Sequence, residues 1–346
     1  MLSGMSSRSQ SLRERTNGYT VTPGQYVHFA QAALIALTVI VMTGAAVRLT
    51  GSGLGCPTWP KCYGNLYPPL DSHAVIEFTN RVLSVPIVLA AGFAWVAALR
   101  RRPYRRDLTW ISSLLPLGVV AQAVLGGFTV KGALDYGWVM GHFALSMLIL
   151  VAAVVLLWRA THEQVVEGRH MTPVEPLADR TLLRLLQGLV AMGALTIFAG
   201  TAATAAGPHA GGSPGQKINR LDFDGRGTMD FVIHRHAEIA FVFSLLAAGI
   251  WWLARRRKAP ERVIRPLTVL CGLLVLQGAV GLDQYETHLP TELVWVHVSL
   301  ASFSWLCTLW AACAAGAFSG VLGALRGRRS SSGSLRAVTS AEVPGN

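Results

Sequence analysis

Charged residues are scarce in this chain. Asp, Glu, Lys and Arg together make up 14% of its 346 residues, whereas a soluble globular domain carries about 25%. Hydrophobic residues account for 52%, and the mean hydropathy is +0.43. So low a charge content excludes an ordinary soluble domain and indicates a protein that lies within a lipid bilayer.

Apolar runs of bilayer-spanning length, about 20 residues each, recur along the chain. Because lipid offers the backbone no hydrogen-bond partner, each run must form an α-helix. The sequence therefore predicts an all-α integral membrane protein with eight transmembrane helices, at residues 26–47, 75–99, 109–128, 138–158, 182–205, 231–254, 263–282 and 291–318. Residues 1–25 and 319–346 are expected to be tails, the second of them disordered.

Acidic residues are fewer than basic ones. The chain has 18 Asp and Glu against 30 Lys and Arg, a net charge of +12. Most of the basic residues fall in the two tails and in the loops after the second, fourth and sixth spans, which the positive-inside rule places in the cytoplasm. The sequence thus predicts a multi-pass protein of the cell membrane with both termini cytoplasmic. Since topology accounts for the basic excess, no nucleic-acid partner is expected.

Cysteine is also rare, with five residues in all. Cys56 and Cys62 lie in the loop after the first span, at residues 48–70, where prolines stiffen the backbone. The predicted topology puts this loop outside the cytoplasm, where disulfides persist, and so favours a Cys56–Cys62 bond. Two free thiols, or a bond that is reduced and re-formed, are the alternatives. The spacing excludes covalent haem attachment through C-x-x-C-H.

The chain contains an internal repeat. Residues 80–102 align with the segment that begins at His234, so that Asn80 pairs with His234, and Gln122 precedes His142 by the same interval as Gln277 precedes His297. Repeats of four spans each enter the membrane from the same side and are parallel.

We therefore expect two pseudo-symmetric four-helix bundles, at 26–158 and 182–318, joined by a cytoplasmic linker at 159–181. Discontinuous helices or substrate-matching charges, which would favour a transporter, are not evident in the sequence.

Four polar residues are predicted at one depth, near the outer ends of their spans: Asn80, His142, His234 and His297. Ionisable groups within a span are costly and are functional candidates by default. His234 and His297 are expected to face each other in the second bundle, either as ligands of a haem iron or as a hydrogen-bonded pair that lines a cavity. His28, His209, His236 and His288 are predicted to be interfacial, without a role.

The first bundle is predicted to differ. His142 takes the ligand position, but Asn80 stands where the aligned repeat has a histidine, and an iron held by His142 alone keeps an open coordination position. Glu77 shares a helix face with Asn80 and Arg81. It is a candidate for proton transfer or for a plain salt bridge to Arg81. Arg81 and Arg235 could pair with haem propionates, or their side chains could extend to the membrane–water interface.

Five sequence stretches together resemble the haem A synthase family: "GAAVRLTGSGLGCPTWPKCYG", "IEFTNR", "LGGFTV" before His142, "GPHAGG" and "HRHAEIA". The resemblance covers residues 26 to 318. It implies a membrane oxidoreductase that converts the C8 methyl of haem O to a formyl group by successive hydroxylation, which supplies haem A to terminal oxidases. It also implies a haem b cofactor and, as possible partners, a haem O synthase and an electron-donor protein; an oligomer is possible.

By this resemblance Glu77 matches the catalytic glutamate, His142 the axial ligand of the substrate haem, and His234 and His297 the ligands of haem b. Cys56 and Cys62 match the outer disulfide. The chain departs from the family pattern at Asn80, where a histidine is usual, and it has no second cysteine pair after the fifth span. The alternative function is a non-catalytic membrane cytochrome b that carries electrons between a quinol or other donor and a partner.

Overall fold

The computed structural model describes residues 19–166, 169–171, 177, 179–213, 215–223 and 227–318. In this part of the chain eight helices are long and apolar enough to cross a membrane, as predicted. They are α2 (Pro23–Leu49), α3 (Ser72–Arg100), α4 (Arg106–Lys131), α5 (Tyr136–Thr161), α6 (Arg180–Ala206), α7 (Thr228–Arg256), α8 (Glu261–Glu286) and α9 (Thr291–Ala314). Residues 1–18 and 319–346, which make up most of the predicted tails, lie outside the described residues.

Short polar side chains define where several helices begin. The hydroxyl of Thr22 accepts a hydrogen bond from the backbone N–H of Gln25, and the Gln25 amide oxygen accepts one from the N–H of Thr22. This capping box satisfies backbone donors that the first turn of α2 leaves free. Asp71, Asp135 and Asp179 cap α3, α5 and α6 without the reciprocal bond: each carboxylate accepts from backbone N–H groups of the first turn.

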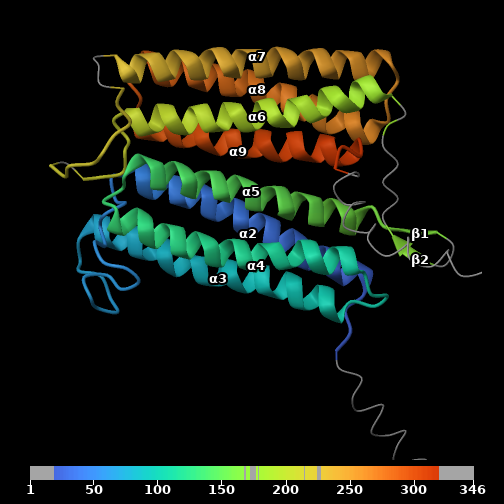
Figure 1. The fold of residues 1–346 in the computed structure, drawn as a ribbon, viewed down its shortest axis with the longest axis horizontal. Helices are drawn as coiled ribbons and strands as arrows, with labels where there is room; N and C mark the ends of the chain where they lie inside the picture. The colour runs from blue at the N-terminus through green and yellow to red at the C-terminus, as the bar shows by residue number, and fades with distance from the viewer. Residues whose placement is uncertain are drawn as a thin grey trace, which may run out of the picture.

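The helices form two groups of four, α2–α5 and α6–α9, which lie one above the other in Figure 1. In the first bundle α2 and α4 each pack against α3 and α5, so α3 and α5 lie diagonally opposite. The second bundle has the same arrangement, with α7 and α9 on a diagonal. The predicted all-α fold of two four-helix bundles is confirmed, and helices that carry the predicted site residues are diagonal partners.

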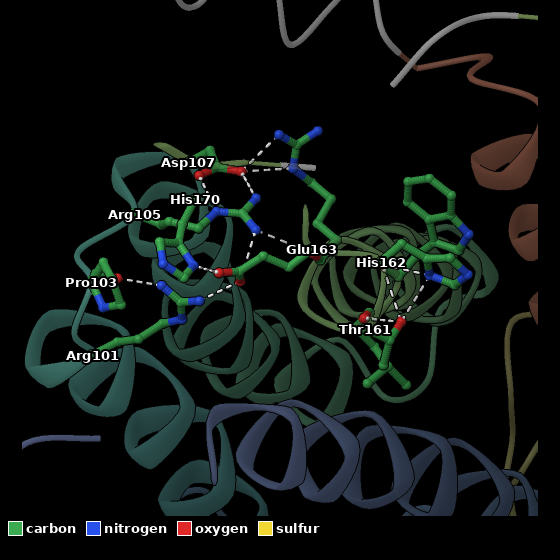
Figure 2. A network of polar contacts seen from close by, with 11 residues as sticks. Arg101, Pro103, Arg105, Asp107, Thr161, His162, Glu163 and His170 are labelled. Carbon is green, nitrogen blue, oxygen red and sulfur yellow. Dashed lines mark hydrogen bonds and ion pairs between the residues drawn. The ribbon is translucent and has the colours of Figure 1, made fainter. Parts of the chain in front are cut away.

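One end of the molecule, which we call the basic end, carries the α3–α4 connection and the segment after α5. That segment forms a hairpin of β1 (Gln164–Val166) and β2 (Arg169–Met171). Glu163 forms ion pairs with Arg101 and Arg105 and a hydrogen bond of 2.6 Å with Nδ1 of His170 (Figure 2). Arg101 and Arg105 are almost fully buried. These arginines therefore join the α3–α4 connection to the hairpin; that the basic end faces the cytoplasm stays a prediction.

The opposite end, which we call the cysteine-loop end, joins the two bundles. The backbone N–H of Gly53 donates to the carbonyl of Gly211 at 2.9 Å, and the Ser213 hydroxyl donates to the carbonyl of Gly51 at 2.9 Å. Glycine permits this approach, because a Cβ on Gly51 would lie 2.9 Å from the carbonyl oxygen of Gly212. The "GPHAGG" stretch after α6 thus anchors the second bundle to the first.

Candidate functional site

The cysteine loop is closed by a Cys56–Cys62 disulfide, as predicted, and both cysteines are buried. Gly55 lets the loop lie directly on the start of α3, since a Cβ there would be 2.2 Å from the carbonyl oxygen of His73. The loop is therefore packed against the first bundle and does not extend freely from it.

Glu77 and Arg81, one turn apart on α3, hold this loop. The Glu77 carboxylate accepts a hydrogen bond from the backbone N–H of Cys56 at 2.7 Å and forms an ion pair with Arg81. The Arg81 guanidinium donates to the carbonyls of Cys56 at 2.9 Å and Thr58 at 2.8 Å. The salt bridge between Glu77 and Arg81, one of the two predictions for Glu77, is present. Together the two side chains fix the backbone of the loop.

The loop brings Trp59 onto α4. A Cβ on Gly127 would lie 3.1 Å from Cδ2 and 3.2 Å from Cε3 of the Trp59 indole, so the ring rests where Gly127 has no side chain. The preceding residue, Gly126, faces His142: a Cβ there would be 3.4 Å from Cε1 of the imidazole. Trp59 of the loop and His142 of α5 thus contact adjacent glycines of α4.

In the second bundle the histidine that faces His297 is His236. The two rings lie 6.2 Å apart between centroids, across the α7–α9 diagonal. Bonds between imidazole nitrogen and a first-row metal are about 2 Å long, so rings at this separation leave room for one metal ion between them.

The predicted pairing of His234 with His297 is wrong. His234 is exposed, its Nδ1 lies 2.7 Å from the carbonyl oxygen of Asp230, and its ring meets Tyr285 of α8 edge-on. Side chains two positions apart on an α-helix point about 200° apart. His234 therefore points away from the direction of His236. His236, which the sequence analysis left without a role, instead faces His297 inside the second bundle; that it lies at the interface stays a prediction.

Each of the three inward histidines rests on a glycine of the neighbouring helix. A Cβ on Gly200 would lie 3.0 Å from Cε1 of His236, and one on Gly281 would lie 3.1 Å from Cε1 of His297. Gly126 does the same for His142.

The repeat extends to the supporting amides. The Gln122 amide donates to the carbonyl of His142 at 2.9 Å, as that of Gln277 donates to the carbonyl of His297 at 3.0 Å. The two bundles thus build one arrangement twice around His142 and His297.

Four polar atoms at these positions are buried without a well-aligned hydrogen bond within the described part of the chain: Nδ1 of His142, His236 and His297, and Oδ1 of Asn80. The backbones of Thr196 and Gln277 lie close to the rings of His236 and His297. Buried polar groups normally have partners, so inward imidazoles in this state fit a metal or a polar ligand between the helices.

Comparison with known proteins places the chain in a family. The family model of COX15-CtaA, described as cytochrome oxidase assembly protein, matches residues 28–310. The chain belongs to this family. It is 30% identical over 290 residues to the haem A synthase of Shouchella clausii, covering 79% of this chain and 92% of the relative.

Two further relatives match over similar lengths. The haem A synthase of Halalkalibacterium halodurans is 28% identical over 81% of this chain and 94% of its own length. The haem A synthase of Shewanella oneidensis is 25% identical over 79% of this chain and 91% of its own. The resemblance read from the motifs is therefore confirmed for nearly the full length of these family members.

Sequence reasoning missed His236 and Trp59. The signal for His236 was present, because Gly44 and Gly200 are separated by the same interval as Asn80 and His236. Aligning the halves on the small residues of α2 and α6 would have placed His236, not His234, opposite Asn80. Trp59 had no such signal, since its contact with Gly127 depends on how the loop folds.

Proposed function

We propose that this chain is a haem A synthase, a membrane enzyme that oxidises the C8 methyl of haem O to a formyl group. The family membership and the named relatives support this function. The observation that carries this proposal is a difference between two otherwise repeated sites. The second bundle has two inward histidines, whereas the first has His142 and Asn80. A non-catalytic cytochrome has no need of such a difference.

His236 and His297 would hold the cofactor, for which we propose haem b. The two inward rings and the separation of their centres fit a haem iron between α7 and α9. A haem bound on both faces supplies one-electron redox chemistry. The chain's own contribution is to orient the rings, through Gly200 and Gly281, and to exclude water with the surrounding helices.

The substrate, haem O, would bind in the first bundle with His142 as its axial ligand. Asn80 is a poor ligand for iron, so it would leave the substrate iron without a second protein ligand. The disulfide loop would cover this site at the cysteine-loop end, with Trp59 seated on Gly127. Arg81 is committed to the loop carbonyls and to Glu77, so we assign it to positioning the loop and not to a propionate.

Glu77 remains our candidate for proton transfer at its carboxylate oxygens. One oxygen accepts from the Cys56 N–H, and the other pairs with Arg81, which keeps the carboxylate at a fixed place near Asn80. The chain is a multi-pass membrane protein. Its cell-membrane location, cytoplasmic termini, and association with a haem O synthase, an electron donor or other copies of itself are further parts of the proposal.

Co-expression with a haem O-producing enzyme tests the function. Haem extracts from cells that contain the chain should hold haem A or its hydroxylated precursor. An expressed, haem-loaded protein that yields neither would refute it.

A further inference from the structure

An ion pair lies on the outward face of a membrane-spanning helix. Arg235 and Glu238 of α7 approach to 2.7 Å, with 54% and 56% of their side chains exposed. Glu238 is ten residues beyond the helix start at Thr228, or about 15 Å along the axis. A helix of 29 residues exceeds the roughly 30 Å hydrocarbon layer by about 14 Å in all, so Glu238 lies within that layer.

Charges at this depth are costly unless something polar covers them. α7 packs against α6 and α8 at the edge of the molecule farthest from the first bundle (Figure 1). With His236 matched to Asn80, the counterparts of Arg235 and Glu238 in the first bundle are Thr79 and Val82, both uncharged. The repeat therefore shows that the fold does not require charges here; they belong to the second bundle alone.

The ion pair is flanked by aromatic rings on the same helix face. Phe231 and Phe241 are 56% and 65% exposed, and the Arg235 guanidinium lies 5.7 Å from the centre of the Phe231 ring. His234 lies on this face as well. We call the set Phe231, His234, Arg235, Glu238 and Phe241 the α7 stripe. It offers a cationic donor at Arg235, a hydrogen-bond acceptor about 4.5 Å further along the axis at Glu238, and a ring face one more turn along at Phe241.

We propose that the α7 stripe binds the head group of a lipid-dissolved quinol. A quinol hydroxyl donates to the Glu238 carboxylate, a quinol oxygen accepts from Arg235, and the flat ring packs against the exposed ring of Phe241, one turn beyond Glu238. The stripe carries no net charge from its ion pair, which disfavours an anionic phospholipid phosphate, and phosphates lie outside the hydrocarbon layer. Its role as the reductant site for the cofactor rests on the proposed function. In that role the quinol would become the quinone: its two electrons would pass one at a time to the cofactor held by His236, next to Arg235 in α7, and its two protons would leave its oxygens, one of them to Glu238.

Equilibrium binding of a radiolabelled short-chain benzoquinol to the full chain in lipid nanodiscs tests the site. We expect saturable binding that Glu238→Gln and Arg235→Gln each weaken by about tenfold, the loss of one hydrogen bond to a charged group. Glu261→Gln is the matched control, because Glu261 and Arg265 form an exposed ion pair on α8 at the basic end. That variant should bind like the unaltered chain. A second readout is the rate at which the quinol, compared with dithionite, reduces the bound haem.

Unsaturable binding, or equal affinity for the Glu238→Gln variant, would overturn the site. So would disulfide cross-linking between two copies of Glu238→Cys, because a second copy would then cover the stripe. Haem A formation driven by a chemical reductant is measured in parallel. A chain that forms haem A but binds no quinol refutes the site alone, and one that binds quinol but never forms haem A refutes the proposed function alone.

Discussion

His236 and His297 place their imidazole rings 6.2 Å apart on diagonal helices, while His234, two residues from His236, turns toward Tyr285. The same short stretch of α7 thus presents one histidine to the bundle interior and another to its surface. This division gives a direct comparison between a proposed ligand and a chemically identical neighbour.

His236→Ala and His297→Ala should each abolish the spectrum of a haem bound by two histidines, because either change leaves the iron with one protein ligand. His234→Ala should keep that spectrum. Optical spectra of the purified variants at matched protein concentration provide the measurement. A lost spectrum in His234→Ala together with a normal one in His236→Ala would contradict the assignment.

Gly127→Val should displace the disulfide loop from α4. The added side chain would meet Trp59, whose ring atoms lie 3.1–3.5 Å from the Cβ position. We expect faster trypsin cleavage after Lys61, an exposed loop residue, and a lower yield of haem A. Gly92→Val is the control, since a Cβ at Gly92 meets nothing within 4 Å, and it adds the same β-branched residue to a helix. Equal cleavage of the two variants would show that Trp59 does not hold the loop.

Glu77→Gln should lower stability by about 3 kcal/mol, because it leaves the half-buried Arg81 without its counter-charge. Adding Arg81→Gln removes both charges and should recover part of this loss. If Glu77 also transfers a proton, the double variant stays inactive although its haem content and melting temperature return toward those of the unaltered chain. Full activity in the double variant would leave Glu77 with the ion pair as its role.

Glu163→Gln should destabilise the basic end in a pH-dependent manner. Burial raises the pKa of the Glu163 carboxyl, but hydrogen bonds from Arg101 and His170 and the charge of Arg101 outweigh it, so the pKa lies below the ordinary 4.5. A depressed pKa means that the stabilisation is complete above about 4.5 and is lost as the pH falls through the folded-state value.

The difference in melting temperature between the unaltered chain and Glu163→Gln should therefore be present at pH 7 and shrink below pH 4.5. The same comparison with Glu261→Gln should show little difference at either pH, since exposed ion pairs contribute about 0–1 kcal/mol. If the melting-temperature difference caused by Glu163→Gln stayed constant across this pH range, it would argue against ion pairs between a charged Glu163 and the arginines.

The sequence predicted the parts of the fold that depend on local composition. Eight apolar runs give eight helices in the described part of the chain, within a few residues of the expected bounds, and the two cysteines of the loop predicted outside the cytoplasm form the disulfide. The last helix ends at Ala314 instead of 318, where small residues continue but the helix does not. Helix existence follows from hydropathy, whereas the end of a helix depends on local hydrogen bonds.

Which side chain faces the bundle interior could not be read as reliably. An alignment error of two residues, harmless for placing α7, exchanges His234 for His236 and so reverses the direction of the side chain. Long-range contacts such as those of Arg81 with the loop carbonyls depend on how the loop folds back, which no local pattern encodes.

The central claim is that the first bundle oxidises a haem while the second holds one. Mass analysis of haems extracted after co-expression with a haem O producer, from the unaltered chain and from His142→Ala, tests it most directly. The account predicts the formyl product with the unaltered chain, and its absence with His142→Ala while the second-bundle haem persists. Formyl product from His142→Ala, or haem O alone from the unaltered and fully haem-loaded chain, would contradict it.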